Sequence, residues 1–240
     1  MRYHRLATKR RGFTLVELLV TVTIVAVLAG RVFIISRRAI NAAQNAECVA
    51  NLRNLATAGM SYEAEHGTYP NHGSQRDGSR SFWFKTLEVE LGFEPGTNAA
   101  VIERADIMPT CKKCLRTHGP GTNPNNRHIR TYSMNHDLIG STKNSDNEWV
   151  FPGLRSTRVV NPSATAFFMD GSVAGTGPYW QYLARIHQWV KPENFIHDSK
   201  ANVVFLDGHV ESFRLEEVPT NPEHPFWNPL QRDPDTPKHR

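Results

Sequence analysis

The chain has 240 residues, enough for one ordinary globular domain and an attached segment. Hydrophobic residues make up 39% of it and the mean hydropathy is -0.47, which excludes a membrane protein with many spans. Its net charge of +5 is local, because five of the 28 basic residues lie in residues 1–12 and the other 23 equal the 23 acidic ones. A nucleic-acid partner, which needs a basic surface, is therefore not predicted.

Residues 13–30 form an apolar run of about the 18 residues that read as a membrane span. The basic residues before this run would keep that end in the cytoplasm. The same pattern, with residues 27–29 as a small-residue cleavage site, is also typical of an ordinary secretory signal peptide. Glu17 argues against a signal peptide, because an ionisable group inside an apolar segment costs about 3 kcal/mol and usually has a partner.

Residues 9–17, KRRGFTLVE, resemble the prepilin cleavage and methylation motif of type IV pilins and type II secretion pseudopilins. The resemblance implies that prepilin peptidase cuts after Gly12 and methylates the new N-terminus at Phe13. It also implies that Glu17 serves filament assembly by pairing with the amine of a neighbouring Phe13. Arg31 places a charge earlier than the family pattern does, which bears on filament stability rather than on processing.

One continuous helix is predicted from residue 13 to about residue 65, because this segment contains no proline. Such a helix would reach about 80 Å, against roughly 30 Å for a bilayer core, so its second half must pack on the following domain. Gly67 and Pro70 would end it. An apolar stripe runs along its second half at Ile40, Ala43, Cys48, Leu52, Leu55, Gly59 and Tyr62.

The remainder reads as short strands separated by turn residues. Two of these strands end in Asp170-Gly171 and Asp207-Gly208, which are strong hairpin signals. We therefore expect an α+β fold, with the long N-terminal helix packed on a small antiparallel sheet, as in pilins. The best strand candidates are residues 130–134, 164–169, 201–206 and 209–214.

The spacing of His197 from Asp207-Gly208 resembles the C-terminal H-x(9)-D-G signature of a large bacterial group of prepilin-like proteins. We interpret His197, Asp207 and Gly208 as structural, because Asp-Gly suits a turn. A metal or acid–base cluster of these residues with Asp198 and His209 is the alternative. The exact function of this prepilin-like group is unassigned, so the resemblance implies an architecture more firmly than a function.

Cys111 and Cys114 are compatible with a disulfide, a zinc site or free thiols. Cys48 fits a small packing residue on the apolar stripe. Asp170 and Asp207 are weak calcium candidates, because some pseudopilins bind calcium in their C-terminal loops. The sequence has no run of closely spaced acids to support such a site, and no cofactor is predicted.

No phosphate-binding glycine loop, nucleophile elbow or HExxH motif occurs, so no enzyme is predicted. A secreted hydrolase would need titratable residues such as His197 and Asp207 to face one pocket. The predicted organisation is a basic leader at 1–12, a membrane and assembly helix at 13–35, an amphipathic stalk at 36–66, a globular domain at 67–217 and a proline-rich tail at 218–240 that is extended or disordered.

The resemblance implies a structural subunit of a pilus-like or pseudopilus-like filament in the bacterial inner membrane. It would cross that membrane once, with its N-terminus in the cytoplasm and its domain in the periplasm or outside the cell. Its partners would be prepilin peptidase, like subunits, the inner-membrane assembly machinery and lipid. A binding module on a pilin-type anchor remains an alternative, for which an exposed cluster would be drawn from Trp149, Phe151, Tyr179, Trp180 and Trp189.

Overall fold

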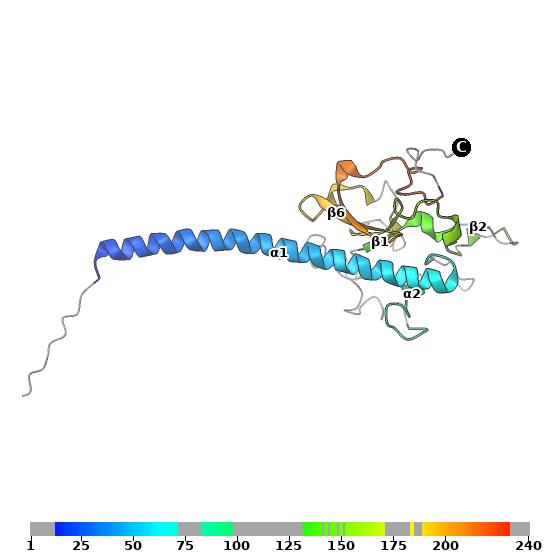
Figure 1. The fold of residues 1–240 in the computed structure, drawn as a ribbon, viewed down its shortest axis with the longest axis horizontal. Helices are drawn as coiled ribbons and strands as arrows, with labels where there is room; N and C mark the ends of the chain where they lie inside the picture. Colours follow the sequence, from blue (N-terminus) through cyan, green and yellow to red (C-terminus); the bar gives the residue numbers. More distant parts are fainter. Residues whose placement is uncertain are drawn as a thin grey trace, which may run out of the picture. The chain divides into compact units, whose positions relative to one another are not determined.

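A computed structural model of the chain contains one uninterrupted helix, α1, of 52 residues from Leu15 to His66 (Figure 1). The predicted long N-terminal helix is therefore confirmed. The helix ends at Gly67, whose φ of 71° lies in the left-handed region that glycine adopts without strain. The Gly67 amide donates to the carbonyl of Glu63 at 2.7 Å and closes the last turn.

The chain divides into two compact units, Met1–Ala43 and Gln44–Arg240. The described part of the first unit consists of the N-terminal portion of α1 and the two residues before it. The second unit contains the rest of α1 and all the strands. The residues that the structure describes are 13–71, 83–97, 132–140, 142–143, 145–147, 149–150, 152–170, 183–184 and 189–230.

The main sheet of the second unit has five strands in the order β5-β1-β4-β6-β7. Neighbours among β1, β4, β6 and β7 pair antiparallel, which confirms the predicted pilin-like α+β architecture. The short β5 pairs parallel to β1 at one edge. These strands are β1 (Tyr132–Asn135), β4 (Ala166–Asp170), β5 (Leu183–Ala184), β6 (Lys200–Phe205) and β7 (Val210–Arg214).

Short elements complete the described fold. β2 (Thr142–Lys143) and β3 (Trp149–Val150) form a separate antiparallel pair. The helix α2 (Trp83–Thr86) places Trp83 and Phe84 in the core. The 3-10 helices are η1 (His136–Ile139), η2 (Ser156–Arg158), η3 (Pro192–Asn194) and η4 (Leu215–Glu217).

The second half of α1 packs through one face, as its apolar stripe predicts. The stripe residues from Cys48 to Gly59 are buried, and Cys48, Leu52 and Leu55 join a core cluster with residues of β1 and β4. Ile40, by contrast, is 53% exposed and lies in the first unit. The packed stripe therefore begins later than predicted, at Cys48, and continues through Leu52, Leu55 and Gly59 to the partly buried Tyr62, with Ala56 and Ala58 beside it.

An irregularity in the pairing of β4 with β6 lies where the sheet contacts α1. Phe167 and Phe168 are consecutive, yet both are fully buried in the cluster that contains the α1 residues. The pairing of β4 with β6 shifts register between Ala166 and Phe168, and such an irregularity interrupts the strict alternation of side chains. The Phe167 ring consequently lies against Gly59, where α1 carries no side chain.

A second core cluster is formed by other residues of the same strands. In β6, Val204 belongs to the cluster with α1, whereas Val203 and Phe205 belong to the second cluster. This alternation follows from the two-residue repeat of a strand. β6 carries buried apolar residues in both clusters, which explains why all its residues after Lys200 are buried.

Residues 218–230 supply much of this second cluster. Phe226 and Trp227 are each only 3% exposed. The carbonyls of Phe226 and Pro229 accept hydrogen bonds from the amides of Ala166 at 3.0 Å and Val160 at 2.9 Å. This differs from the extended or disordered tail that the proline content predicts. Buried aromatic rings and accepted hydrogen bonds order the segment, because a proline residue lacks only the donor.

We expect Gly59→Ala to destabilise the second unit, although alanine is the better helix former by about 1 kcal/mol. The new Cβ would lie 2.3 Å from Cζ of Phe167, whose ring is buried and cannot move freely. Such overpacking costs about 1–3 kcal/mol. Denaturant unfolding of the detergent-solubilised chain measures the change. The free-energy loss caused by Gly59→Ala should be smaller in a Phe167→Leu background than in the unmodified chain. An equal loss in both backgrounds would contradict the proposed contact.

Candidate functional site

The residues of the predicted processing motif lie at the start of α1. Gly12 is outside the described residues, and Phe13 is the first described residue, with 78% of its surface exposed. Glu17 follows in the first turn of the helix. A scissile bond just before Phe13 would thus immediately precede the helix.

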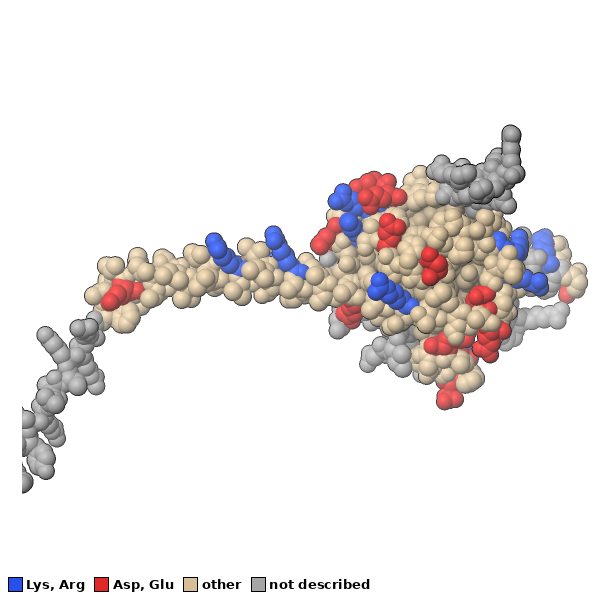
Figure 2. Space-filling view, viewed as in Figure 1, with Lys and Arg blue, Asp and Glu red and all other residues tan. Residues whose placement is uncertain are grey.

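The first half of α1 exposes apolar side chains on all its faces. Its large hydrophobic residues from Leu15 to Ile35 are each at least 46% exposed. Among the described residues, α1 is the one helix long and apolar enough to cross a membrane. Figure 2 shows this segment as mostly neutral surface, with acidic atoms near its N-terminal end and basic atoms further along. A helix that is apolar all round must be covered by lipid or by other helices.

Polar side chains inside this apolar segment bond to their own helix. Oε2 of Glu17 accepts from the amide of Thr14 at 2.9 Å and from its hydroxyl at 2.8 Å. The Glu17 amide donates to Oγ1 of Thr14 at 3.2 Å. Thr21 and Thr23 donate their hydroxyls to the carbonyls of Leu18 and Val20, each at 2.8 Å. Such local bonds satisfy polar groups that lipid cannot.

The role of Thr14 was missed by the sequence analysis, although a signal for it exists. Threonine followed three residues later by glutamate is the capping-box pattern at the start of a helix. Here Thr14 and Glu17 form that pair, with both reciprocal bonds present. Glu17 therefore caps its own helix in the isolated chain, in addition to any role between subunits.

A buried polar network centres on Asp170, at the end of β4. Its side chain is fully buried. Oδ1 accepts from the backbone amide of Asn202 at 2.8 Å, and Oδ2 accepts from Nδ2 of Asn202 at 2.8 Å. Oδ2 also lies 3.2 Å from Nε2 of His197. These donors replace the water that a buried carboxylate loses.

Asn202 extends this network to other elements. Its Nδ2 also donates to Oδ1 of Asn45 on α1 at 2.8 Å. Its Oδ1 accepts from the hydroxyl of Ser212 on β7 at 2.6 Å. The network therefore links α1, β4, β6 and β7, and it specifies how the stalk half of α1 sits on the sheet.

A tight turn places His197 at the start of β6. His197 and Lys200 exchange backbone hydrogen bonds at 2.9 and 3.1 Å. Asp198 and Ser199 between them have φ of 54° and 63°, the positive values that a two-residue hairpin turn requires. His197 is consequently buried, 5% exposed, and directed at Asp170.

Asp207 and Gly208 lie in the turn between β6 and β7, as predicted. Gly208 has φ of 88°. Asp207 is exposed and accepts from the amide of His209 at 3.1 Å, with the His209 ring contacting the same oxygen. The two predicted Asp-Gly turns are thus unlike, since Asp170 is a buried acceptor. His197 and Asp207 do not meet, so the four-residue cluster with Asp198 and His209 is not formed.

The remaining candidate residues lie either outside the described residues or in the core. Cys111 and Cys114 lie outside the described residues, so their state stays a prediction. Among the aromatic candidates for a binding surface, Trp189 is fully buried and donates its ring N–H to the Asp170 carbonyl at 2.9 Å. The side chains of Trp149, Phe151, Tyr179 and Trp180 are not described.

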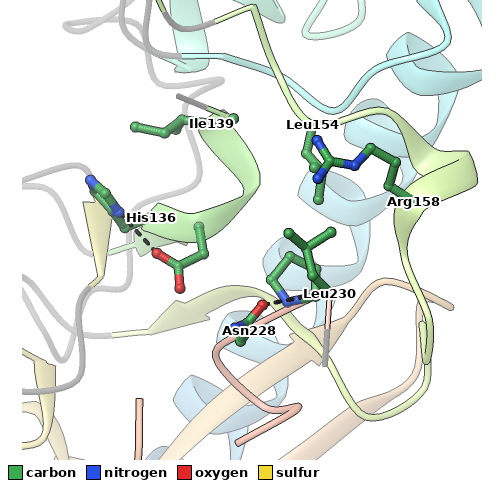
Figure 3. Close-up of a pocket in the computed structure, with 9 residues that line it drawn as sticks. His136, Ile139, Leu154, Arg158, Asn228 and Leu230 are labelled. Carbon is green, nitrogen blue, oxygen red and sulfur yellow. Dashed lines mark hydrogen bonds and ion pairs between the residues drawn. The ribbon is translucent and has the colours of Figure 1, made fainter. Parts of the chain in front are cut away.

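A pocket of about 280 Å³ lies between η1, the segment around Leu154 and the C-terminal segment (Figure 3). His136 and Arg158 stand on opposite sides of it in this view, with Leu230 between them. His136 bonds to Asp137 at 3.1 Å. The nine residues that line the pocket include the charged or titratable side chains of His136, Asp137 and Arg158 beside apolar ones.

Comparison with known families identifies one motif. Residues 7–30 match the prokaryotic N-terminal methylation motif. The match includes Gly12, Phe13 and Glu17, and it confirms the predicted prepilin-type cleavage and methylation motif on a hydrophobic N-terminal helix. It does not extend to His197 or Asp207, so the H-x(9)-D-G resemblance stays a prediction. Searches of the curated proteins and of the solved structures found no significant match.

The two aspartates of the Asp-Gly pairs should respond differently to the same substitution. Asp170→Asn places an amide N–H against buried donors, and we expect a loss of about 2–3 kcal/mol in the free energy of unfolding. Asp207→Asn keeps an acceptor in an exposed turn and should change it by less than about 0.5 kcal/mol. Urea unfolding of the full chain in detergent, followed by tryptophan fluorescence, compares them. Equal losses would rule out the buried network as a source of stability.

Proposed function

We propose that this prepilin-like chain is a non-enzymatic structural subunit of a pilus-like or pseudopilus-like filament. The observation that carries the proposal is the methylation motif at residues 7–30, which includes the start of an exposed apolar helix. The motif implies processing by prepilin peptidase. The helix supplies both a membrane anchor and a surface for like helices.

Processing changes the electrostatics at the start of α1. Cleavage after Gly12 removes the basic leader and converts the Phe13 amide into a charged amine. Gly12 suits the scissile position, because it has no side chain to hinder the approach of a peptidase. The chain would then be held in the inner membrane by one span, with its N-terminus on the cytoplasmic side.

Assembly would exchange contacts with lipid for contacts between helices. Hydrophobic burial alone does not drive this exchange, because lipid is as apolar as the side chains. Close packing and a polar pair can drive it. In a filament the Glu17 carboxylate would face the Phe13 amine of a neighbouring subunit, and this attraction would fix the axial register. The bonds to Thr14 keep the carboxylate satisfied until then.

The second unit would be the part displayed in the periplasm or outside the cell. Its pocket near Arg158 and Leu230 favours a second candidate function, a binding module on a pilin-type anchor. The pocket combines the Arg158 cation, the His136 imidazole, the Asp137 carboxylate and apolar side chains, which suits a small ligand with both polar and apolar groups. The two functions are compatible, since a filament subunit can carry a binding site.

The mature protein should begin at an N-methylated Phe13. Intact-mass and N-terminal peptide spectrometry of the membrane fraction would detect it. Gly12→Val should leave the leader attached, because a branched side chain obstructs the scissile bond, whereas Ala7→Val should be processed normally. A mature N-terminus near Gly30 would instead mean that signal peptidase releases a soluble protein, and the filament proposal would fail.

Substitutions at Glu17 and Thr14 separate the assembly role from the capping role. We expect Glu17→Ala and Glu17→Gln to leave insertion and cleavage largely intact and to reduce sheared filaments severalfold. Glutamine can still cap the helix but carries no charge to attract the amine. Thr14→Val keeps the carboxylate and should assemble almost normally. Filament yields for Glu17→Gln as high as for the unmodified chain would show that the charge is dispensable.

A further inference from the structure

Three metal-binding side chains from distant parts of the sequence meet inside the second unit. They are Cys48 on α1, Asp170 at the end of β4 and His197 before β6, and each is at most 5% exposed. One ligand atom from each lies within 4.8 Å of the other two. We propose that these three side chains bind a zinc ion.

The separation of the His197 and Asp170 ligand atoms can be compared with zinc coordination. Zinc lies about 2.0–2.2 Å from nitrogen and oxygen ligands and about 2.3 Å from sulfur, so two ligands of a tetrahedral ion are about 3.3–3.6 Å apart. Nε2 of His197 and Oδ2 of Asp170 are 3.2 Å apart. A direct bond between an imidazolium and a carboxylate is shorter, about 2.7–2.9 Å. The observed separation is close to the spacing of two zinc ligands and also lies within the range of an ordinary N–H···O hydrogen bond, so a bound zinc ion would replace the direct contact between His197 and Asp170.

The chemistry of the three donors selects the metal. A thiolate, an imidazole and one carboxylate oxygen form a set typical of zinc. Calcium needs six or more oxygen ligands and is a poor match. Three protein ligands leave one coordination position, which a water molecule can take. Binding requires the Cys48 thiol to lose its proton to solvent, so zinc affinity should fall as the pH is lowered.

The surroundings hold the ligands in place. The backbone amide and side chain of Asn202 bind both oxygens of Asp170, and Ser212 in turn orients Asn202. The tight turn at Asp198 and Ser199 positions His197. Such outer contacts are typical of metal sites, where they orient the ligands. The ion would join α1 to the sheet at the point where Asn45 also bonds to Asn202.

Another group of possible ligands lies at the end of α1 and provides a control. Glu65, His66 and Glu90 also place ligand atoms within 4.8 Å of one another, but Glu65 and His66 are exposed. The pKa of the nearby Tyr62 is raised, mainly by burial and then by the Glu90 carboxylate. This group has no thiol, so it cannot produce the spectrum of a metal bound to sulfur.

The test uses the full chain with Cys111→Ser and Cys114→Ser, which leaves Cys48 as its single cysteine. The protein is purified in detergent from cells grown with added zinc, and its metal content is measured. We expect about one zinc per chain. Replacement by cobalt should then produce a thiolate-to-cobalt charge-transfer band, which can come only from Cys48. Absence of zinc, or zinc without this band after cobalt exchange, would overturn the proposal.

Matched variants in the same background locate the ion. His197→Gln should lose the zinc, whereas His209→Gln, at an exposed histidine, should keep it. Cys48→Ala should lose it, whereas Val203→Ala, a buried truncation in the other core cluster, should keep it. Glu65→Gln should have no effect, and zinc lost there but kept in His197→Gln would place the ion elsewhere. If circular dichroism shows that His197→Gln or Cys48→Ala does not fold, the presence or absence of the cobalt band in the parent protein tests the proposal.

Discussion

The two halves of α1 are exposed to different surroundings, and the rest of the structure depends on how its second half packs. The first half of α1 is apolar on every face, whereas the second half buries only the face that carries Cys48, Leu52 and Gly59. No proline interrupts the helix between the two halves. Within the second unit, the packing of α1 on the sheet holds the globular part to this helix.

Two carboxylates, Glu17 at the start of α1 and Asp170 in the sheet, lie among apolar residues and accept hydrogen bonds from nearby donors. Glu17 accepts bonds from Thr14 within its own first turn. Asp170 accepts bonds from Asn202 within the sheet, and the same asparagine reaches Asn45 on α1. The donors to Glu17 are local in sequence, whereas those to Asp170 come from β6, and in both cases the carboxylate is hydrogen-bonded before any further partner binds. A second partner, an amine for Glu17 or a metal ion for Asp170, would add to an arrangement already in place.

The two Asp-Gly pairs show why sequence patterns predicted only part of the site. Asp207-Gly208 forms the expected hairpin turn, because the turn needs just the local preferences of those two residues. Asp170 has the same local pattern and became a buried acceptor, because β6 and the turn before it supply donors from 27 to 32 residues away. Residues 218–230 show the same limit, since their prolines suggest an exposed tail and their aromatic side chains are buried in the second core cluster.

The sequence alone determined the processing motif, the apolar segment, the unbroken helix, the α+β class and the positions of the main strands. Each of these depends on residues close together in the chain, through length, periodicity or a fixed spacing. Only the tertiary structure decided that Cys48, Asp170 and His197 meet, that Gly59 lies under Phe167, and that the C-terminal segment joins the core. Those contacts depend on how the sheet bulges and how α1 packs on it, which no local pattern encodes.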